Sequence, residues 1–173
     1  MKTTKWVQGL TAGIALLACA TVATEVEAKP RVAVLAFELK DVTLAPGIPA
    51  EIKRTAAIRP ALEAELNKAG YEWVDISASA QQHAAAGEGY LFDHADAAAE
   101  LGKLYGVDYV LVGRLHKPSF LFFYLLARLV DVHKGSFAGD YVYEVKGGEK
   151  KLVANGVAEL TEKITHTLAN SPY

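Results

Sequence analysis

Cysteine is nearly absent from this sequence: Cys19 is the only one in 173 residues, so no intramolecular disulfide can support the fold. An excess of basic residues is also absent, since the formal net charge is −2 and the sequence pI is about 6.2. This charge balance, without an arginine-rich stripe, argues against nucleic-acid binding. Long apolar runs are missing as well. The first one is interrupted by Gln8, Thr11 and Gly13 and is too short for a comfortable membrane-spanning helix.

Signatures of nucleotide binding and of nucleophilic catalysis are missing too. Gly87-Glu88-Gly89 lacks the third glycine of a dinucleotide fingerprint and does not connect a strand to a helix. Neither Ser119 nor Ser136 lies in a nucleophile elbow. The sequence therefore predicts a protein that is not an enzyme and binds no cofactor. An enzyme with an unrecognised site is the alternative, because distant residues can converge in space.

Residues 1–28 have the three parts of an export signal. Lys2 and Lys5 supply the positive charge, residues 6–18 are mostly apolar, and Val26-Glu27-Ala28 is a small-residue cleavage pattern. We expect cleavage after Ala28 and one folded domain, residues 29–173, in the periplasm. A signal that is retained as an anchor is the alternative.

Leu16-Leu17-Ala18-Cys19 resembles a bacterial lipobox, in which the cysteine is lipidated and becomes the mature amino terminus. Lipidation at Cys19 would anchor the protein to a membrane. The alternative is that the cysteine is removed together with the signal. Both outcomes stay open from the sequence.

Apolar patterns predict a single mixed β-sheet packed by helices, an α/β (α+β) fold of order β-α-β-α-β-β-β-α. Pro60 within the first helical pattern predicts either a kink or a fresh helix start. Gly106 predicts a helix end, and Lys134-Gly135 predicts a hairpin turn. The segment 77–91 is ambiguous and favours a weak helix followed by a loop. The expected strands are 31–37, 71–76, 108–116, 120–132 and 137–146, and the expected helices are 50–69, 94–105 and 150–168.

The run from Phe120 to Leu126 is apolar on both of the faces that a strand would present. One interpretation is a central strand covered on both sides. The other is that one face packs beneath helices while the second contacts a protein partner or a second copy. Phe137 and Tyr109 are expected to extend that aromatic surface. The partner-binding candidates are Phe120, Phe122, Tyr124, Tyr141 and Tyr143.

Asp93, His94 and Asp96 form the only local cluster with metal-ligating side chains, but their spacing matches no zinc or calcium pattern. A simpler interpretation is that Asp93 caps the helix that follows and that Asp96 favours its dipole. A periplasmic protein that binds a metal or a small ligand is therefore the alternative to a partner-binding domain.

The second half of the chain resembles known periplasmic domains. The passage from Leu101 to Gly113 is similar to the helix-Gly-strand segment of the CsgG-like and TolB amino-terminal-like domains, and residues 32–37 resemble their first strand. A family of secreted bacterial proteins of unknown function is more similar still. It shares the spacing of Val112, Gly113, Lys117 and Ser119 and the hairpin of Asp131 and Gly135.

These shared motifs are structural glycines and strand patterns, so the resemblance specifies fold better than activity. The chain departs from the family of unknown function by lacking a cysteine pair at residues 89–96. What the resemblance implies is a non-enzymatic accessory domain of the cell envelope that binds or helps assemble a protein partner.

The lipobox hypothesis makes a prediction about Cys19. If Cys19 carries the lipid anchor, Cys19→Ala removes the attachment site of the acyl chains that hold the protein on the membrane. We then expect the protein to move from the membrane fraction to the soluble fraction, or its precursor to stay unprocessed. Fractionation with amino-terminal sequencing measures this. A soluble wild-type protein that begins at Lys29 would show ordinary cleavage instead.

Overall fold

The computed structural model describes residues 29–146 and 151–173. Its strands form one mixed sheet, in which β1 and β2 both lie beside β3, followed by β4 and β5. β1 and β2 run parallel to β3, whereas β3–β4 and β4–β5 pair antiparallel. The predicted α/β fold with a single mixed sheet is confirmed. The strands are β1 (Val32–Val34), β2 (Glu38–Asp41), β3 (Tyr109–Lys117), β4 (Phe122–Asp131) and β5 (Ser136–Lys146).

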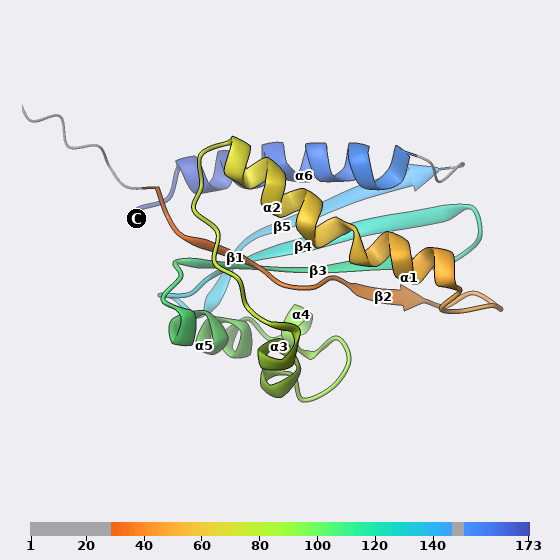
Figure 1. The fold of residues 1–173 in the computed structure, drawn as a ribbon, viewed down its shortest axis with the longest axis horizontal. Coiled ribbons are helices and arrows are strands. Elements are labelled where there is room, and N and C mark those ends of the chain that lie inside the picture. Colours follow the sequence, from red (N-terminus) through yellow and green to blue (C-terminus); the bar gives the residue numbers. More distant parts are fainter. Residues whose placement is uncertain (1–28, 147–150) are drawn as a thin grey trace, which may run out of the picture.

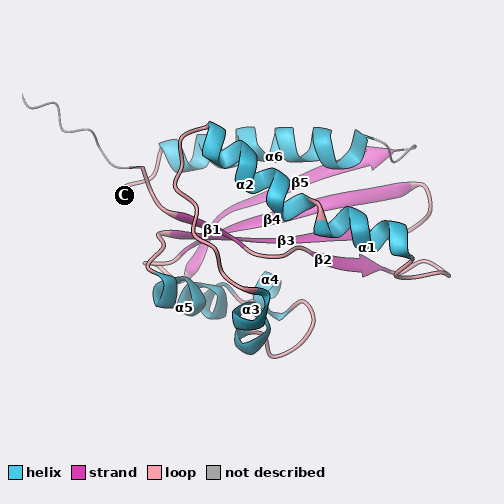
Figure 2. Cartoon of the chain, viewed as in Figure 1, coloured by secondary structure: helices cyan, strands magenta, loops and turns pink. Residues whose placement is uncertain are grey.

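Helices pack on both faces of this sheet but do not cover them equally (Figures 1 and 2). α1 (Pro49–Ala56), α2 (Ile58–Lys68) and α6 (Leu152–Ala169) follow the whole length of one face. α3 (Ala78–Ala84), α4 (Tyr90–Asp93) and α5 (Ala95–Tyr105) gather beneath the end of the other face that holds β1. Two separate apolar cores result, one on each side of the sheet.

Of the strand expected at 31–37, only Val32–Val34 is observed, as β1. A bulge in the residues that follow separates β1 from β2. Val34 pairs with Leu111, but Glu38 pairs with Arg114, so this side of the ladder contains one extra residue. The backbone of Ala36 lies in this bulge and exchanges two hydrogen bonds with the side-chain amide of Gln81, at 2.9 and 3.0 Å.

The bulge directs the Phe37 ring onto Gly113 of β3. A Cβ atom at Gly113 would lie 2.1 Å from that ring, so only glycine fits there. This contact gives the Val112-Gly113 motif of the sequence a physical reason.

Other elements differ from their expected extent. The strand expected at 71–76 is reduced to an isolated bridge between Trp73 and Val32. The helix expected at 50–69 is divided at Ala57, and Pro60 lies in the first turn of α2, as the alternative of a fresh helix start predicts. Gly106 ends α5 in the left-handed conformation, as expected.

The β4–β5 hairpin is held by the buried carboxylate of Asp131. It accepts hydrogen bonds from the backbone N–H and the ammonium of Lys134, at 2.9 and 2.8 Å. Burial alone would raise the pKa of Asp131, but these bonds outweigh it and the pKa is lowered. Gly135 adopts a positive φ of 64° and donates its N–H to the Asp131 carbonyl. The turn predicted at Lys134-Gly135 is therefore stabilised by the Asp131 carboxylate.

We predict that Asp131→Ala lowers the free energy of unfolding by about 1–3 kcal/mol near neutral pH, because it removes the two hydrogen bonds that Lys134 donates to the buried carboxylate. The folded pKa is depressed, so the contribution is present above the unfolded value of about 3.9 and is lost as pH falls through the folded value. Urea unfolding at about pH 7 and about pH 3 measures both effects. A wild-type–variant difference that is the same at both pH values would contradict the role of the charge.

Candidate interaction surface

The side chains of β4 alternate between the two sheet faces, and their burial alternates with them. Phe123 and Leu125 are fully buried in the core shared with α2 and α6. Phe122 and Tyr124 project to the opposite face, where they are half-buried. Phe120 lies outside the strand, in the loop between β3 and β4, and is exposed. The run predicted from sequence therefore combines core residues with residues that solvent can reach.

Tyr141 and Tyr143 do not lie beside Phe122 and Tyr124, which corrects the sequence prediction. In the register, Tyr141 pairs with Ala127 and Tyr143 pairs with Leu125, so both tyrosines belong to the helix-covered face. Tyr141 is buried, which raises its pKa, and its hydroxyl donates to Thr167 Oγ1 of α6 at 2.8 Å.

Two further aromatic residues also differ from expectation. Tyr109 is buried in the core on the helix-covered face, where its hydroxyl lies 2.8 Å from Ser171 Oγ. Phe137 lies on the opposite face from Tyr141, because the ladder shifts register between Leu129 and Val130. The bulge therefore separates side chains that period-two counting places together.

Two arginines mark where the helix layer on the second face ends. The guanidinium carbons of Arg114 and Arg128 lie 4.3 and 4.5 Å from the centroid of the Phe92 ring of α4. Asp93 pairs with both arginines, at 3.5 and 3.4 Å. The remaining carboxylates in this cluster are Glu38, 3.1 Å from Arg114, and Asp140, 3.2 Å from Arg128.

Beyond these arginines, the sheet is not covered by any helix within residues 29–146 and 151–173 (Figure 1). The His116 ring of β3 lies 6.2 Å from the Tyr124 ring and its Nδ1 lies 3.3 Å from the Lys40 carbonyl. Val142 of β5 is half exposed. We call this region the open sheet face; its residues are Lys40, His116, Phe122, Tyr124, Val142 and Glu144.

The metal candidates are not assembled into a site. Asp93 forms ion pairs with Arg114 and Arg128. The His94 ring instead stacks on the Tyr90 ring, with 4.1 Å between the ring centroids, and His94 Nδ1 lies 4.0 Å from Asp96. In the part of the chain that the structure describes, no group of three metal-ligating side chains converges. The expected cap at Asp93 is also wrong, because α5 has His94 at its N-cap and Asp93 ends α4.

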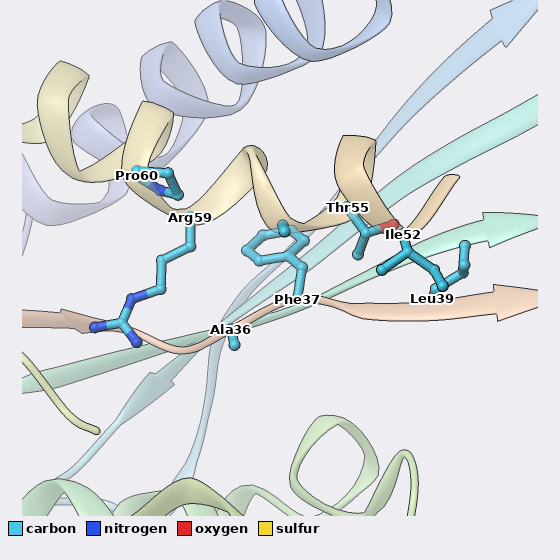
Figure 3. Close-up of a pocket in the computed structure, with 8 residues that line it drawn as sticks. Ala36, Phe37, Leu39, Ile52, Thr55, Arg59 and Pro60 are labelled. Carbon is cyan, nitrogen blue, oxygen red and sulfur yellow. The ribbon is translucent and has the colours of Figure 1, made fainter. Parts of the chain in front are cut away.

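An apolar cavity of about 320 Å³ lies between the β1–β2 connection and the α1–α2 junction (Figure 3). Its lining includes Phe37, Leu39 and Ile52. Arg59 lines one side, and its guanidinium is held by Glu63 and Asp75. The cavity suits an aliphatic group better than a charged one.

The far end of the sheet carries exposed aliphatic and aromatic side chains on two neighbouring loops. The loops are 42–48, between β2 and α1, and 118–121, between β3 and β4. They are adjacent because the Val42 N–H donates to the Lys117 carbonyl at 3.1 Å. We call this region, together with the first turn of α1, the apolar end; its exposed residues are Val42, Leu44, Ile48, Ile52 of α1, Phe120 and Leu121.

A buried ion pair forms the base of the apolar end. Lys117 of β3 donates to Glu51 of α1 at 2.7 Å, and their side chains are 3% and 1% exposed. Arg54 also pairs with Glu51, and the Lys117 ammonium lies 5.1 Å from the Phe123 ring. Sequence reasoning noted Lys117 as a charge that flanks the apolar run and as part of a family resemblance, but it missed Glu51, since the partners are far apart in the chain.

Comparison with known proteins places the chain in a family. It belongs to the family whose model, DUF3280, is described as "Protein of unknown function (DUF2380)" and matches residues 30–164. The expected membership in a family of unknown function is thereby confirmed, whereas a relation to the CsgG-like domains is not shown. No curated protein matches the chain.

Solved structures share the fold. Lipoprotein GNA1162 from Neisseria meningitidis is 16% identical, with 83% of this chain and 99% of that chain covered and a TM-score of 0.52. Hypothetical protein CT253 from Chlamydia trachomatis is 12% identical, with 83% and 100% covered and a TM-score of 0.54. TolB from Acinetobacter baumannii is 15% identical, with 84% and 29% covered and a TM-score of 0.49. At such identities, the first two likenesses show a common fold and nothing about activity.

The buried pair makes a prediction about stability. Lys117→Met lowers the free energy of unfolding by about 3–5 kcal/mol, because it leaves the Glu51 carboxylate buried without its main partner. Adding Glu51→Leu restores most of the loss. Chemical denaturation of the single and double variants measures the coupling. Lys163→Met, which breaks the exposed pair with Glu159, is the control and changes stability by less than about 1 kcal/mol. A double variant no more stable than Lys117→Met would contradict this role.

Proposed function

We propose that this protein is a non-enzymatic accessory domain of the bacterial envelope that binds a protein partner through the open sheet face. One observation carries the proposal: part of one sheet face has no helix over it within the described residues, yet it carries Phe122, Tyr124 and Val142. Sheets bury their apolar faces against another layer, so a face left bare in the monomer favours a partner.

The composition of the open sheet face is that of a protein interface. Aromatic and aliphatic side chains occupy its centre, whereas Lys40 and Glu144 provide exposed charges at its two borders. Aromatic centres with a polar rim are characteristic of binding hot spots. Because α3, α4 and α5 already pack on this side, a partner's amphipathic helix would continue their layer beyond Arg114.

The export signal predicted from the sequence supports an envelope location. The structure does not describe residues 1–28, but their sequence has the three parts of an export signal. One protein of the same fold is a lipoprotein by name, and Cys19 is the residue that would carry a lipid here. Among helices with described residues, none combines the length and apolar character needed to cross a bilayer.

A second candidate function is binding of a small apolar ligand. The cavity of about 320 Å³ beside Phe37 is the observation that favours it. Native mass spectrometry after gentle purification would reveal a retained ligand, and Ile52→Trp would displace it by filling the space.

The test of partner binding places a photocrosslinking phenylalanine analogue at Tyr124 in cells that make the protein. We expect one specific protein adduct, because Tyr124 lies at the centre of the open sheet face. The same analogue at Trp73, 37% exposed at the β1 edge, is the control and gives no such adduct. Mass spectrometry identifies the partner.

Paired substitutions separate contact from core. Phe122→Ser with Tyr124→Ser abolishes binding of the identified partner while the domain stays folded. Phe123→Ala with Leu125→Ala instead costs about 2–5 kcal/mol of stability for each truncation. The proposal fails if no adduct forms at Tyr124 and both pairs of substitutions unfold the protein equally.

A further inference from the structure

Large apolar side chains are concentrated at one end of the molecule. Leu44 is 98% exposed and Leu121 is 68% exposed, one at each of the two loops of the apolar end. Isolated exposed leucines are ordinary, but five large apolar side chains on two adjacent loops, with Ile52 one helical turn beyond Ile48, are not. Figure 1 shows both loops projecting from the same end of the sheet, opposite the carboxyl terminus.

We propose that the apolar end inserts into the interface of a bilayer that contains anionic lipids. The proposal concerns a different ligand and a surface that shares only Lys40 with the open sheet face, so it goes beyond the partner binding proposed above. Its occupant is a lipid surface, which the shape, the side-chain types and the charges of the apolar end favour.

Shape and side-chain type favour lipid over protein. Protein interfaces are centred on well-packed aromatic and arginine side chains in pockets. At the apolar end the side chains are instead Val, Leu, Ile and Phe on two loop tips, of which Leu44 is almost wholly surrounded by solvent. A convex apolar tip can enter the acyl boundary of a membrane without a complementary pocket.

Charge complementarity points to anionic lipid headgroups. Lys40, at the β2 end of this region, and Lys53, in α1, are exposed. Of the neighbouring carboxylates, Glu51 is buried and its charge is offset by Lys117 and Arg54. Asp41 accepts a hydrogen bond from Thr43 at 2.7 Å and keeps its negative charge. Glu144 lies in the same cross-strand row as Lys40 but on β5, three strand spacings or about 14 Å away, where salt screens its charge. The exposed Lys40 and Lys53 therefore outnumber the Asp41 carboxylate, and the charge beside the loops favours an anionic surface.

The buried ion pair gives the two loops a fixed spacing. Lys117 precedes the 118–121 loop, and Glu51 lies in the first turn of the helix that follows the 42–48 loop. Because the pair joins them at 2.7 Å, both loops present their apolar side chains together. A preorganised tip loses less conformational entropy on insertion than two independent loops would.

The experiment uses the full chain with Cys19→Ala, so that no acyl group or second thiol contributes. A polarity-sensitive fluorophore is attached to a cysteine introduced by Leu121→Cys, and vesicles of phosphatidylcholine with phosphatidylglycerol are added. We expect a blue shift and a gain in intensity at this position. The matched control is Leu104→Cys, which is 83% exposed in α5 and shows neither change. Since the probe reports locally, contact through residues 1–28 alone does not produce the signal at position 121.

Two further variants in the Leu121→Cys background test the chemistry. Lys40→Glu with Lys53→Glu lowers affinity for the phosphatidylglycerol vesicles by roughly 10-fold or more, because each lysine near an anionic surface contributes. Leu44→Asp lowers it by roughly 10-fold as well, since an apolar anchor is lost. Thermal melts confirm that each variant is folded.

The proposal is overturned if the fluorophore at position 121 responds no more than the one at position 104. It is also overturned if the position-121 signal appears only with an envelope protein extract, since that would make the apolar end a protein contact. Neither result affects the crosslinking test at Tyr124, so failure of the lipid proposal and failure of partner binding are distinguishable.

Discussion

The ion pair between Lys117 and Glu51 is the constraint on which the apolar end of the molecule depends. Taking two charges out of water is costly unless they are paired, so Glu51 cannot leave Lys117 without a large loss of stability. The pair fixes α1 over the end of β3 and thereby holds the end of the 42–48 loop near the start of the 118–121 loop. Because this contact joins the two loops, their exposed apolar side chains form one surface. If the loops moved independently, those side chains would not present a common surface.

Local patterns predicted the elements whose causes are local. Gly106 ends α5 because glycine reaches the left-handed conformation freely, and the Asp131–Gly135 turn depends on groups within a few residues. The mixed sheet followed from apolar runs separated by such signals. The strand expected at 71–76 shrank to the bridge at Trp73, because strand length depends on available neighbours rather than on the apolar run itself.

The candidate surface was harder to predict, since it depends on register. Period-two alternation correctly separates Phe122 and Tyr124 from Phe123 and Leu125, which requires only one strand. It fails for Phe137 because a register shift at Leu129 and Val130 intervenes. It also fails to show which face of β5 meets α6, a question decided by the pairing of Tyr141 with Ala127 across the sheet. Non-local contacts such as Glu51 with Lys117 leave no periodic signal at all.

The open sheet face and the apolar end share one structural element, the β3–β4 hairpin. Tyr124 and His116 lie on its strands, and Phe120 and Leu121 lie in its loop. If the loop enters a lipid interface, the strands that carry the open sheet face stand next to that membrane. A partner bound there would then be selected among proteins at the same surface, and membrane contact would raise its effective concentration without any new protein contact. The two proposed surfaces would act together through geometry alone, with no conformational change required.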